Sequence, residues 1–169
     1  FGATSYAGLN VQAILTDSTA MATGTGGILA FEGKYSGSSL ANYAAIGGLK
    51  ENSTAGNYAG YLGLYTRANG SLPAERMRIT SGGYVGIGTT SPPQLFAVHG
   101  SSDPAINVRH VSGGVDANFY CNSTIANIGT SSGHPFTLHT SNTERVRIDS
   151  SGNVGIGVTP TAKLHVYVG

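Results

Sequence analysis

The stretch Glu75-Arg-Met-Arg-Ile-Thr-Ser-Gly-Gly-Tyr-Val-Gly-Ile-Gly88 returns 69 positions later as Glu144-Arg-Val-Arg-Ile-Asp-Ser-Ser-Gly-Asn-Val-Gly-Ile-Gly157, with 10 of 14 residues identical. The similarity continues downstream, where residues 92–98 align with residues 160–166 after one gap. Internal repeats are typical of rods and stacks, because each unit buries its apolar face against a neighbour. The sequence therefore indicates a structural assembly rather than a catalytic domain.

Within each copy, apolar and polar residues alternate with the period of a β-strand. Met77 and Ile79 point to one side, and Arg76 and Arg78 point to the other. In the second copy, Ser-Ser-Gly-Asn at 150–153 has the composition of a tight turn, in which Gly152 accommodates a positive φ. Each copy thus predicts a β-hairpin. The repeat positions that we expect to have the same structural role in both copies are Glu75, Arg76, Arg78, Ile79, Val85, Gly86, Ile87, Gly88, Glu144, Arg145, Arg147, Ile148, Val154, Gly155, Ile156 and Gly157.

The returning strand of each hairpin has a glycine at every second position. Alternating glycine weakens an isolated strand, so its presence in both copies predicts that another backbone lies close by, and a second copy of the chain is the expected neighbour. The apolar repeat residues are expected to be buried, and the arginines to lie on the opposite face and bind glutamates or carbonyl groups. We expect Glu75 and Glu144 to form ion pairs with the adjacent Arg76 and Arg145.

No window shows helical periodicity with caps, and glycine or β-branched residues interrupt the alanine-rich stretches. The predicted fold is all-β, a tandem array of β-hairpin and β-meander modules. Residues 1–92 form the first module with N-terminal lead-in strands, residues 93–160 form the second module, and residues 161–169 form a terminal strand or the opening strand of a further module. Large side chains are too few to close a core within one module of about 70 residues, which predicts that neighbouring chains cover it.

The composition excludes several classes of partner. Glycine makes up 26 of 169 residues and charged residues only 10%, against about 25% in an average domain, which is typical of secreted and virion β proteins. The net charge of +1 and the absence of a basic run argue against nucleic acid. No apolar run approaches the roughly 20 residues of a membrane span, so membrane insertion is not expected.

The repeat, followed by a Thr-Pro or Thr-Thr-Ser-Pro step and Lys-Leu-His-Val, resembles a repeat of bacteriophage tail-fibre and related virion fibre proteins. The close match covers residues 75–98 and 144–166. The resemblance implies a homotrimer in which three parallel chains wrap β-strands around a common axis in the virion, in contact with other virion or fibre proteins. The family often carries an intramolecular chaperone domain downstream, and no stretch of these 169 residues resembles it.

The sequence gives little support for catalysis, metal binding or a cofactor. We therefore expect that the protein is not an enzyme. Glycan hydrolysis needs two facing carboxylates, but the acidic residues outside the repeat glutamates are scattered singly. The five histidines lack the spacing of a zinc site. Gly24-Thr-Gly-Gly27 lacks the ending of a phosphate-binding loop, and the single Cys121 is expected to be a half-buried strand residue.

The candidate receptor-contact residues are Asn57, Tyr61, Tyr65, Arg67 and Asn69. They lie in or beside the longer loops of the first module, at 47–58 and 66–74, and repeat arrays carry their variation in such loops. Exposed tyrosine with asparagine and arginine can stack on sugars or contact protein surfaces. The alternatives are cross-strand packing of the tyrosines and a spacer that makes no receptor contact.

These observations predict a structural and adhesive segment of a phage tail or virion fibre that supports or contributes to recognition of a host-surface glycan or protein. Two other classes stay open: the stalk of a bacterial trimeric surface adhesin, and a tailspike-type glycan-degrading enzyme. Gene neighbourhood separates the first two, because tail or capsid genes favour the virion and a downstream membrane-anchor gene favours the adhesin.

Overall fold

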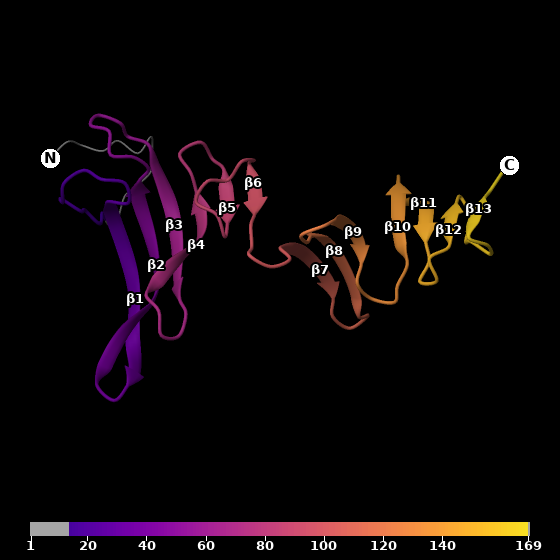
Figure 1. Cartoon of the computed structure of the whole chain (residues 1–169), viewed down its shortest axis with the longest axis horizontal. Coiled ribbons are helices and arrows are strands. Elements are labelled where there is room, and N and C mark those ends of the chain that lie inside the picture. Colours follow the sequence, from indigo (N-terminus) through magenta and orange to yellow (C-terminus); the bar gives the residue numbers. More distant parts are fainter. Residues whose placement is uncertain (1–13, 169) are drawn as a thin grey trace. The chain divides into compact units, whose positions relative to one another are not determined.

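The computed structural model describes residues 14–168, and within this range the chain is all-β, without a helix (Figure 1). The all-β prediction is therefore confirmed. The chain divides into two compact units, residues 1–99 and residues 100–169. The part of the predicted N-terminal lead-in that falls on residues 1–13 lies outside the described residues.

The first unit contains one six-stranded sheet in the order β1-β2-β3-β4-β5-β6. Neighbouring strands are antiparallel from β1 to β5, and β6 then pairs in parallel with β5. The sheet is thus a meander with one parallel return. Its strands are β1 (Gly26–Ser36), β2 (Ser39–Lys50), β3 (Gly60–Arg67), β4 (Pro73–Ile79), β5 (Val85–Ile87) and β6 (Phe96–Val98).

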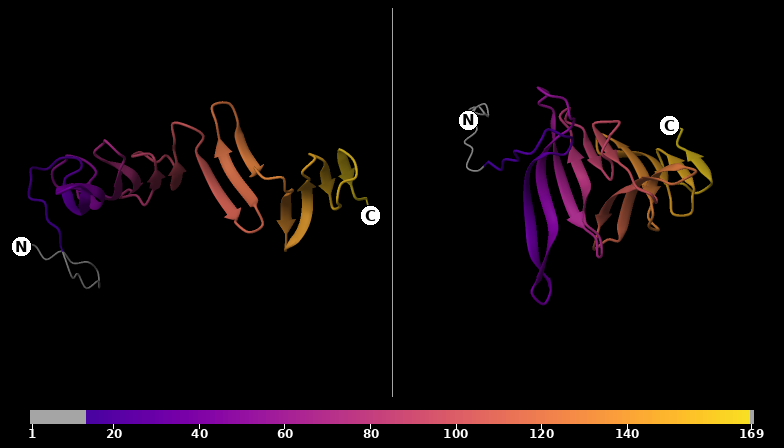
Figure 2. Two further views of the ribbon diagram at one scale, coloured as in Figure 1. Left: turned by 90° about the horizontal axis from the view of Figure 1, so that it is seen from below. Right: turned by 60° about the vertical axis from the view of Figure 1, so that its left-hand side comes forward.

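The second unit contains two sheets. A three-stranded antiparallel sheet, whose strands lie side by side in Figure 2, consists of β7 (Ala105–His110), β8 (Val115–Cys121) and β9 (Ala126–Thr130). A four-stranded sheet consists of β10 (Phe136–Thr140), β11 (Thr143–Ile148), β12 (Val154–Ile156) and β13 (Leu164–Val166). In this sheet β13 pairs in parallel with β12, as β6 does with β5.

The two copies of the repeat have the same backbone hydrogen bonds, and both contain the predicted hairpin. The turn before β5 is closed by Thr80 N, which donates to Tyr84 O over 3.0 Å, and the turn before β12 by Asp149 N, which donates to Asn153 O over 2.9 Å. Gly83 and Gly152 occupy the positive-φ position of the two turns, at 78° and 74°. Four sequence differences between the copies therefore leave the backbone unchanged.

The parallel return strand sets the boundary between the units. Val85 N donates to Leu95 O over 2.8 Å, and His99 N donates to Ile87 O over 2.9 Å. These bonds attach β6 to the first sheet, whereas the sequence predicts that the same residues begin a second module at residue 93. The compact units consequently meet between residues 99 and 100.

The glycines of the return strand are explained by the chain itself. A Cβ atom added at Gly86 would lie 2.6 Å from the carbonyl oxygen of Thr89, in the loop that leads to β6. At Gly155 it would collide with the carbonyl oxygen of Val158 and the ring of Pro160. The expectation that a second copy of the chain approaches these glycines is therefore wrong, because the chain's own loop crosses directly over them.

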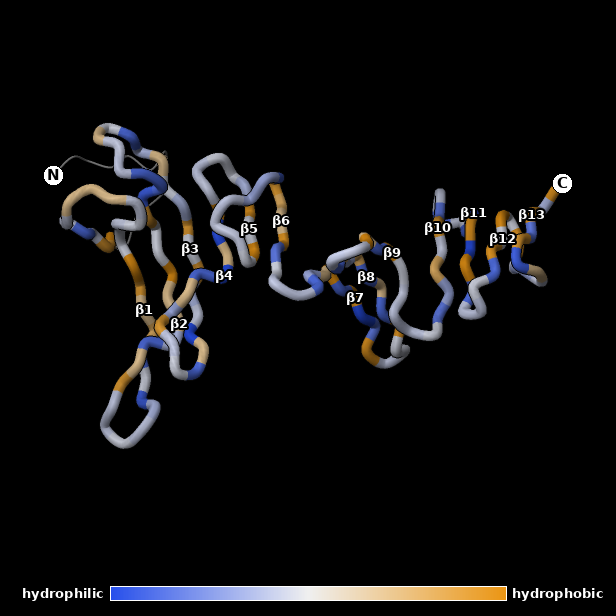
Figure 3. Tube along the Cα trace, in the orientation of Figure 1, coloured by the Kyte–Doolittle hydropathy of each residue, from blue (hydrophilic) through white to orange (hydrophobic). Residues whose placement is uncertain are grey.

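One face of each sheet is apolar across its full width. In the first sheet the register aligns Leu29, Ile46, Leu64, Met77, Ile87 and Val98, one residue from each strand. In the four-stranded sheet it aligns Leu138, Val146, Ile156 and Val166, and in the three-stranded sheet Ile106, Phe119 and Ile128. Figure 3 shows apolar segments in strands of all three sheets.

These apolar faces are open to solvent in the single chain. Ile148 is 41% exposed, Leu138 51% and Phe119 59%, and the buried hydrophobic side chains among the described residues are Ala41, Leu49, Tyr61 and Ala97. In the single chain none of the six apolar repeat residues is buried: Ile87, Ile148 and Ile156 are exposed, and Ile79, Val85 and Val154 are half-buried, so their predicted burial depends on cover from another chain. They lack cover because the crossing loop lies on the glycine face, opposite the apolar one.

Candidate functional site

The five candidate receptor-contact residues do not form one patch. Asn57 belongs to the loop between β2 and β3, whereas Arg67 ends β3 and Asn69 lies in the loop between β3 and β4. Figure 1 shows these two loops at opposite ends of the sheet. Eight residues of β3 separate them, a length of roughly 25 Å at the usual strand rise.

Tyr61 and Tyr65 belong to a cluster inside the first sheet. The guanidinium carbon of Arg78 lies 3.6 Å from the centre of the Tyr61 ring, and the two tyrosine hydroxyls are 3.4 Å apart. The Tyr65 hydroxyl donates to Glu75 Oε2 over 3.3 Å. Burial, together with the Tyr61 hydroxyl and Glu75, raises the pKa of Tyr65 above its ordinary value. With Tyr61 only 7% exposed, this cluster stabilises the sheet and leaves little surface for a ligand.

A glycine makes room for this cluster. A Cβ atom at Gly63, which lies between the two tyrosines, would approach the Tyr65 ring to 2.7 Å. The Tyr65 ring therefore lies flat over the backbone of its own strand.

The repeat glutamates pair with different arginines from those expected. Glu75 accepts hydrogen bonds from Arg78 Nε and Nη2 over 2.7 and 2.8 Å, and the second copy has the same bidentate pair between Glu144 and Arg147. The pairing with Arg76 and Arg145 is wrong, because those side chains bind threonine hydroxyls on the neighbouring strand. The hydrogen bonds from Arg147 lower the pKa of Glu144.

Asn57 is occupied within its own loop. Its Oδ1 accepts a hydrogen bond from Ala59 N over 2.8 Å, and its backbone carbonyl accepts one from Lys50 Nζ. Tyr58, beside it, is 99% exposed. This end of the sheet therefore presents a single exposed ring beside an asparagine that is already bonded.

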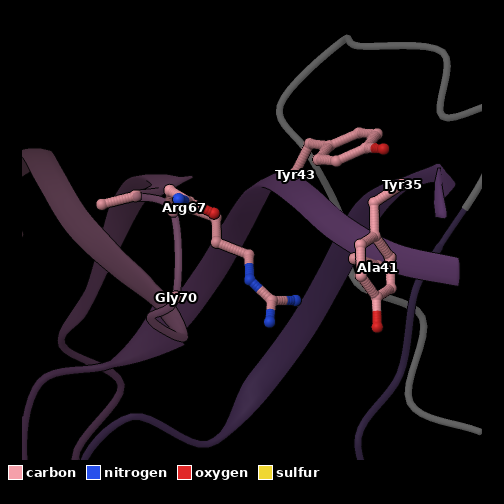
Figure 4. A pocket seen from close by; sticks show the side chains of 7 residues that line it. Tyr35, Ala41, Tyr43, Arg67 and Gly70 are labelled. Atoms are coloured by element: carbon pink, nitrogen blue, oxygen red, sulfur yellow. The ribbon is translucent and has the colours of Figure 1, made fainter.

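A groove of about 490 Å³ lies at the other end, between the β1–β2 hairpin and the β3–β4 loop (Figure 4). It is lined by Tyr35, Ala41, Tyr43, Arg67, Ala68, Asn69 and Gly70. Arg67 and Asn69 were candidates from the sequence, whereas Tyr35 and Tyr43 were missed. The sequence feature that could have indicated Tyr35 and Tyr43 is their position on either side of the turn at Gly37. This turn joins β1 and β2 into a hairpin beside β3.

The remaining side chains that could bind a metal or react do not gather into a site among the described residues. Residues 14–168 contain no group of three histidine, cysteine, aspartate or glutamate side chains that could hold a metal ion. Cys121, expected to be half-buried, is exposed. None of the described residues forms a helix long and apolar enough to cross a bilayer.

Comparison with known proteins adds no identification. The chain matches no protein-family model, and no curated protein matches it.

Proposed function

We propose that this chain is a structural and adhesive segment of a phage tail or virion fibre, in which three parallel copies assemble through the apolar faces of their sheets. The observation that carries the proposal is the open apolar face on each of the three sheets. The number three and the parallel orientation come from the resemblance of the repeat to phage fibre proteins. The proposed role is mechanical and adhesive, without catalysis.

In each sheet that contains a copy of the repeat, the two faces differ in how far the chain itself covers them. On one face, Gly86 and Gly155 are buried beneath the chain's own loops. On the other, rows of leucine, isoleucine and valine have no cover. Large contiguous apolar patches on a protein surface mark interaction sites. Since all three sheets carry one, copies of the same chain are the partners that could cover every face together.

The energy available from this cover is substantial. Fully burying one large aliphatic side chain contributes about 1.5–3 kcal/mol. Ile148 and Leu138 are 41% and 51% exposed, so covering them would add about half that amount for each residue and chain. Eight apolar positions on this face of the four-stranded sheet, repeated in three chains, would supply enough to support a stable trimer. The register aligns them in two rows of four, Leu138, Val146, Ile156 and Val166, and Phe136, Ile148, Val154 and Leu164.

The decisive measurement is the mass of the folded chain in solution. Native mass spectrometry and sedimentation equilibrium at micromolar concentration should give three times the chain mass of 17.2 kDa. A folded monomer would refute the assembly, and a dimer would refute the fibre architecture. Adsorption of the purified trimer to candidate host cells then separates an adhesive segment from a spacer.

A further inference from the structure

The groove at the end of the first sheet contains a preorganised aromatic wall. The register of β1 and β2 shifts so that Phe31 pairs with Ala44 and Glu32 with Asn42, which leaves Tyr43 as the extra residue of a β-bulge. Bulges re-aim a side chain, and they occur often beside binding sites. The Tyr43 ring crosses Gly33, where a Cβ atom would lie 2.8 Å from it. Its hydroxyl donates to Lys34 O over 2.6 Å, which fixes the ring's orientation.

A second tyrosine and a positive charge complete the groove. Tyr35 is 65% exposed, and in Figure 4 the Arg67 guanidinium extends toward the side of the groove on which the Tyr35 ring lies. Among the described residues Arg67 has no carboxylate within ion-pair distance, whereas Arg78, Arg109 and Arg147 each have one. The groove lining itself contains no acidic residue.

The loop that carries Asn69 is ordered by its own turn. Ser71 N donates to Ala68 O over 3.1 Å, and Gly70 supplies the positive φ of 74° that the turn needs. This places Asn69 beside Arg67 at the rim of the groove. In the second unit, two residues, Ser141 and Asn142, make the corresponding turn.

We propose that this groove binds an anionic saccharide, one that carries a carboxylate or a phosphate. The tyrosine rings would stack on the apolar face of a sugar ring, the Arg67 guanidinium would bind the anion through its planar fork, and Asn69 would bind hydroxyl groups. This inference rests on the proposed host-recognition role and specifies its ligand. Charge supports the anionic class, because an unpaired guanidinium stands in a groove without an acidic residue.

The test is a ligand-observed NMR titration of the full 169-residue chain with glucuronate, glucose 6-phosphate and glucose. At least one of the two anionic sugars should bind about tenfold or more tightly than glucose, since a paired anion adds a charge-assisted bond. Whether glucuronate or glucose 6-phosphate binds more tightly identifies the anion, and either order supports the proposal. Equal binding of all three sugars would overturn it, as would acetate or inorganic phosphate binding as tightly as the anionic sugar.

Four variants locate the site. Arg67→Ala should abolish the difference between anionic and neutral sugars, and Arg67→Lys should restore only part of it, because lysine keeps the charge but loses the fork. Tyr43→Ala should weaken the binding of all three sugars. Arg109→Ala, which removes an exposed arginine of the second unit, should leave binding unchanged. Equal effects of Arg67→Ala and Arg109→Ala would overturn the assignment.

Failure of this inference is distinguishable from failure of the proposed function. A trimer that adsorbs to cells but binds no anionic sugar would refute saccharide binding in the groove and would leave the fibre role unaffected. A folded monomer that binds glucuronate through Arg67 supports the groove and refutes the fibre.

Discussion

Replacing Leu138 by aspartate, with Thr137→Asp as its control, tests whether the apolar face of the four-stranded sheet is covered by other copies. Leu138 is 51% exposed in the single chain, so an aspartate there keeps about half its contact with water and the isolated sheet should tolerate it. In an assembly that covers this face, the same carboxylate loses its water. The effective penalty is several kcal/mol per buried ion.

Three such charges in one trimer would cost on the order of 10 kcal/mol. At 1.4 kcal/mol per factor of ten, the association constant would fall by roughly 10⁷, and the trimer should dissociate at micromolar concentration. Thr137 is the adjacent residue on the opposite face, and the register places it beside Arg147, so an aspartate there lies on the polar face next to the Glu144–Arg147 pair. Sedimentation equilibrium should find monomer for Leu138→Asp and trimer for Thr137→Asp, with strand content by circular dichroism unchanged. Trimer for both variants would refute the reasoning.

Three further predictions test contacts within the repeats. Gly155→Ala should destabilise the chain by about 1–3 kcal/mol in denaturant titrations, because its methyl group collides with the crossing loop, whereas Gly129→Ala, with nothing within 4 Å, should be close to neutral. Hydrogen bonds, first of all that from the Asn153 amide, hold the pKa of Asp149 below its ordinary value of 3.8. The stability that these bonds add is therefore present above pH 3.8, and it is lost as the pH falls through the lower pKa of the folded state. Asp149→Thr should remove the acid-induced change in the amide shifts of this turn. Arg78→Lys should cost about 1–2 kcal/mol and Arg147→Lys less than about 1, because their side chains are 14% and 28% exposed, and thermal unfolding that ranks them equally would contradict this.

The sequence predicts this fold where the information is local. Alternation around Ile79 and Ile148, with glycine in the following turn, is enough to predict both hairpins, because a strand has a period of two. The parallel pairing of β6 with β5 was missed, since it depends on where an eight-residue loop returns. The close neighbour of Gly86 was misassigned for the same reason: an alternating glycine reveals that a backbone is near, but not whose backbone it is.

The candidate site was predictable only in part. Arg67 and Asn69 stand out because the first unit has a longer loop where the second has a two-residue turn. Tyr43 does not stand out, because its direction depends on a bulge in the pairing of two strands, which no local pattern encodes. Tyr61 and Tyr65 looked available because strand alternation cannot reveal that Arg78, 17 positions from Tyr61 along the chain, lies across the first ring.

In the proposed assembly, the near-identity of the two repeats would create a problem of alignment between chains. Their apolar rows have the same spacing and similar side chains, so a chain displaced by 69 residues could pair its first repeat with the second repeat of a neighbour at little loss of contact. The β1–β2 hairpin belongs to the same sheet as the first repeat, whereas β7, β8 and β9 form a separate sheet before the second repeat, so in a displaced assembly these strands would face the wrong partners. The strands outside the two repeats would thus set the register between chains, and removing them should yield staggered polymers in place of closed trimers.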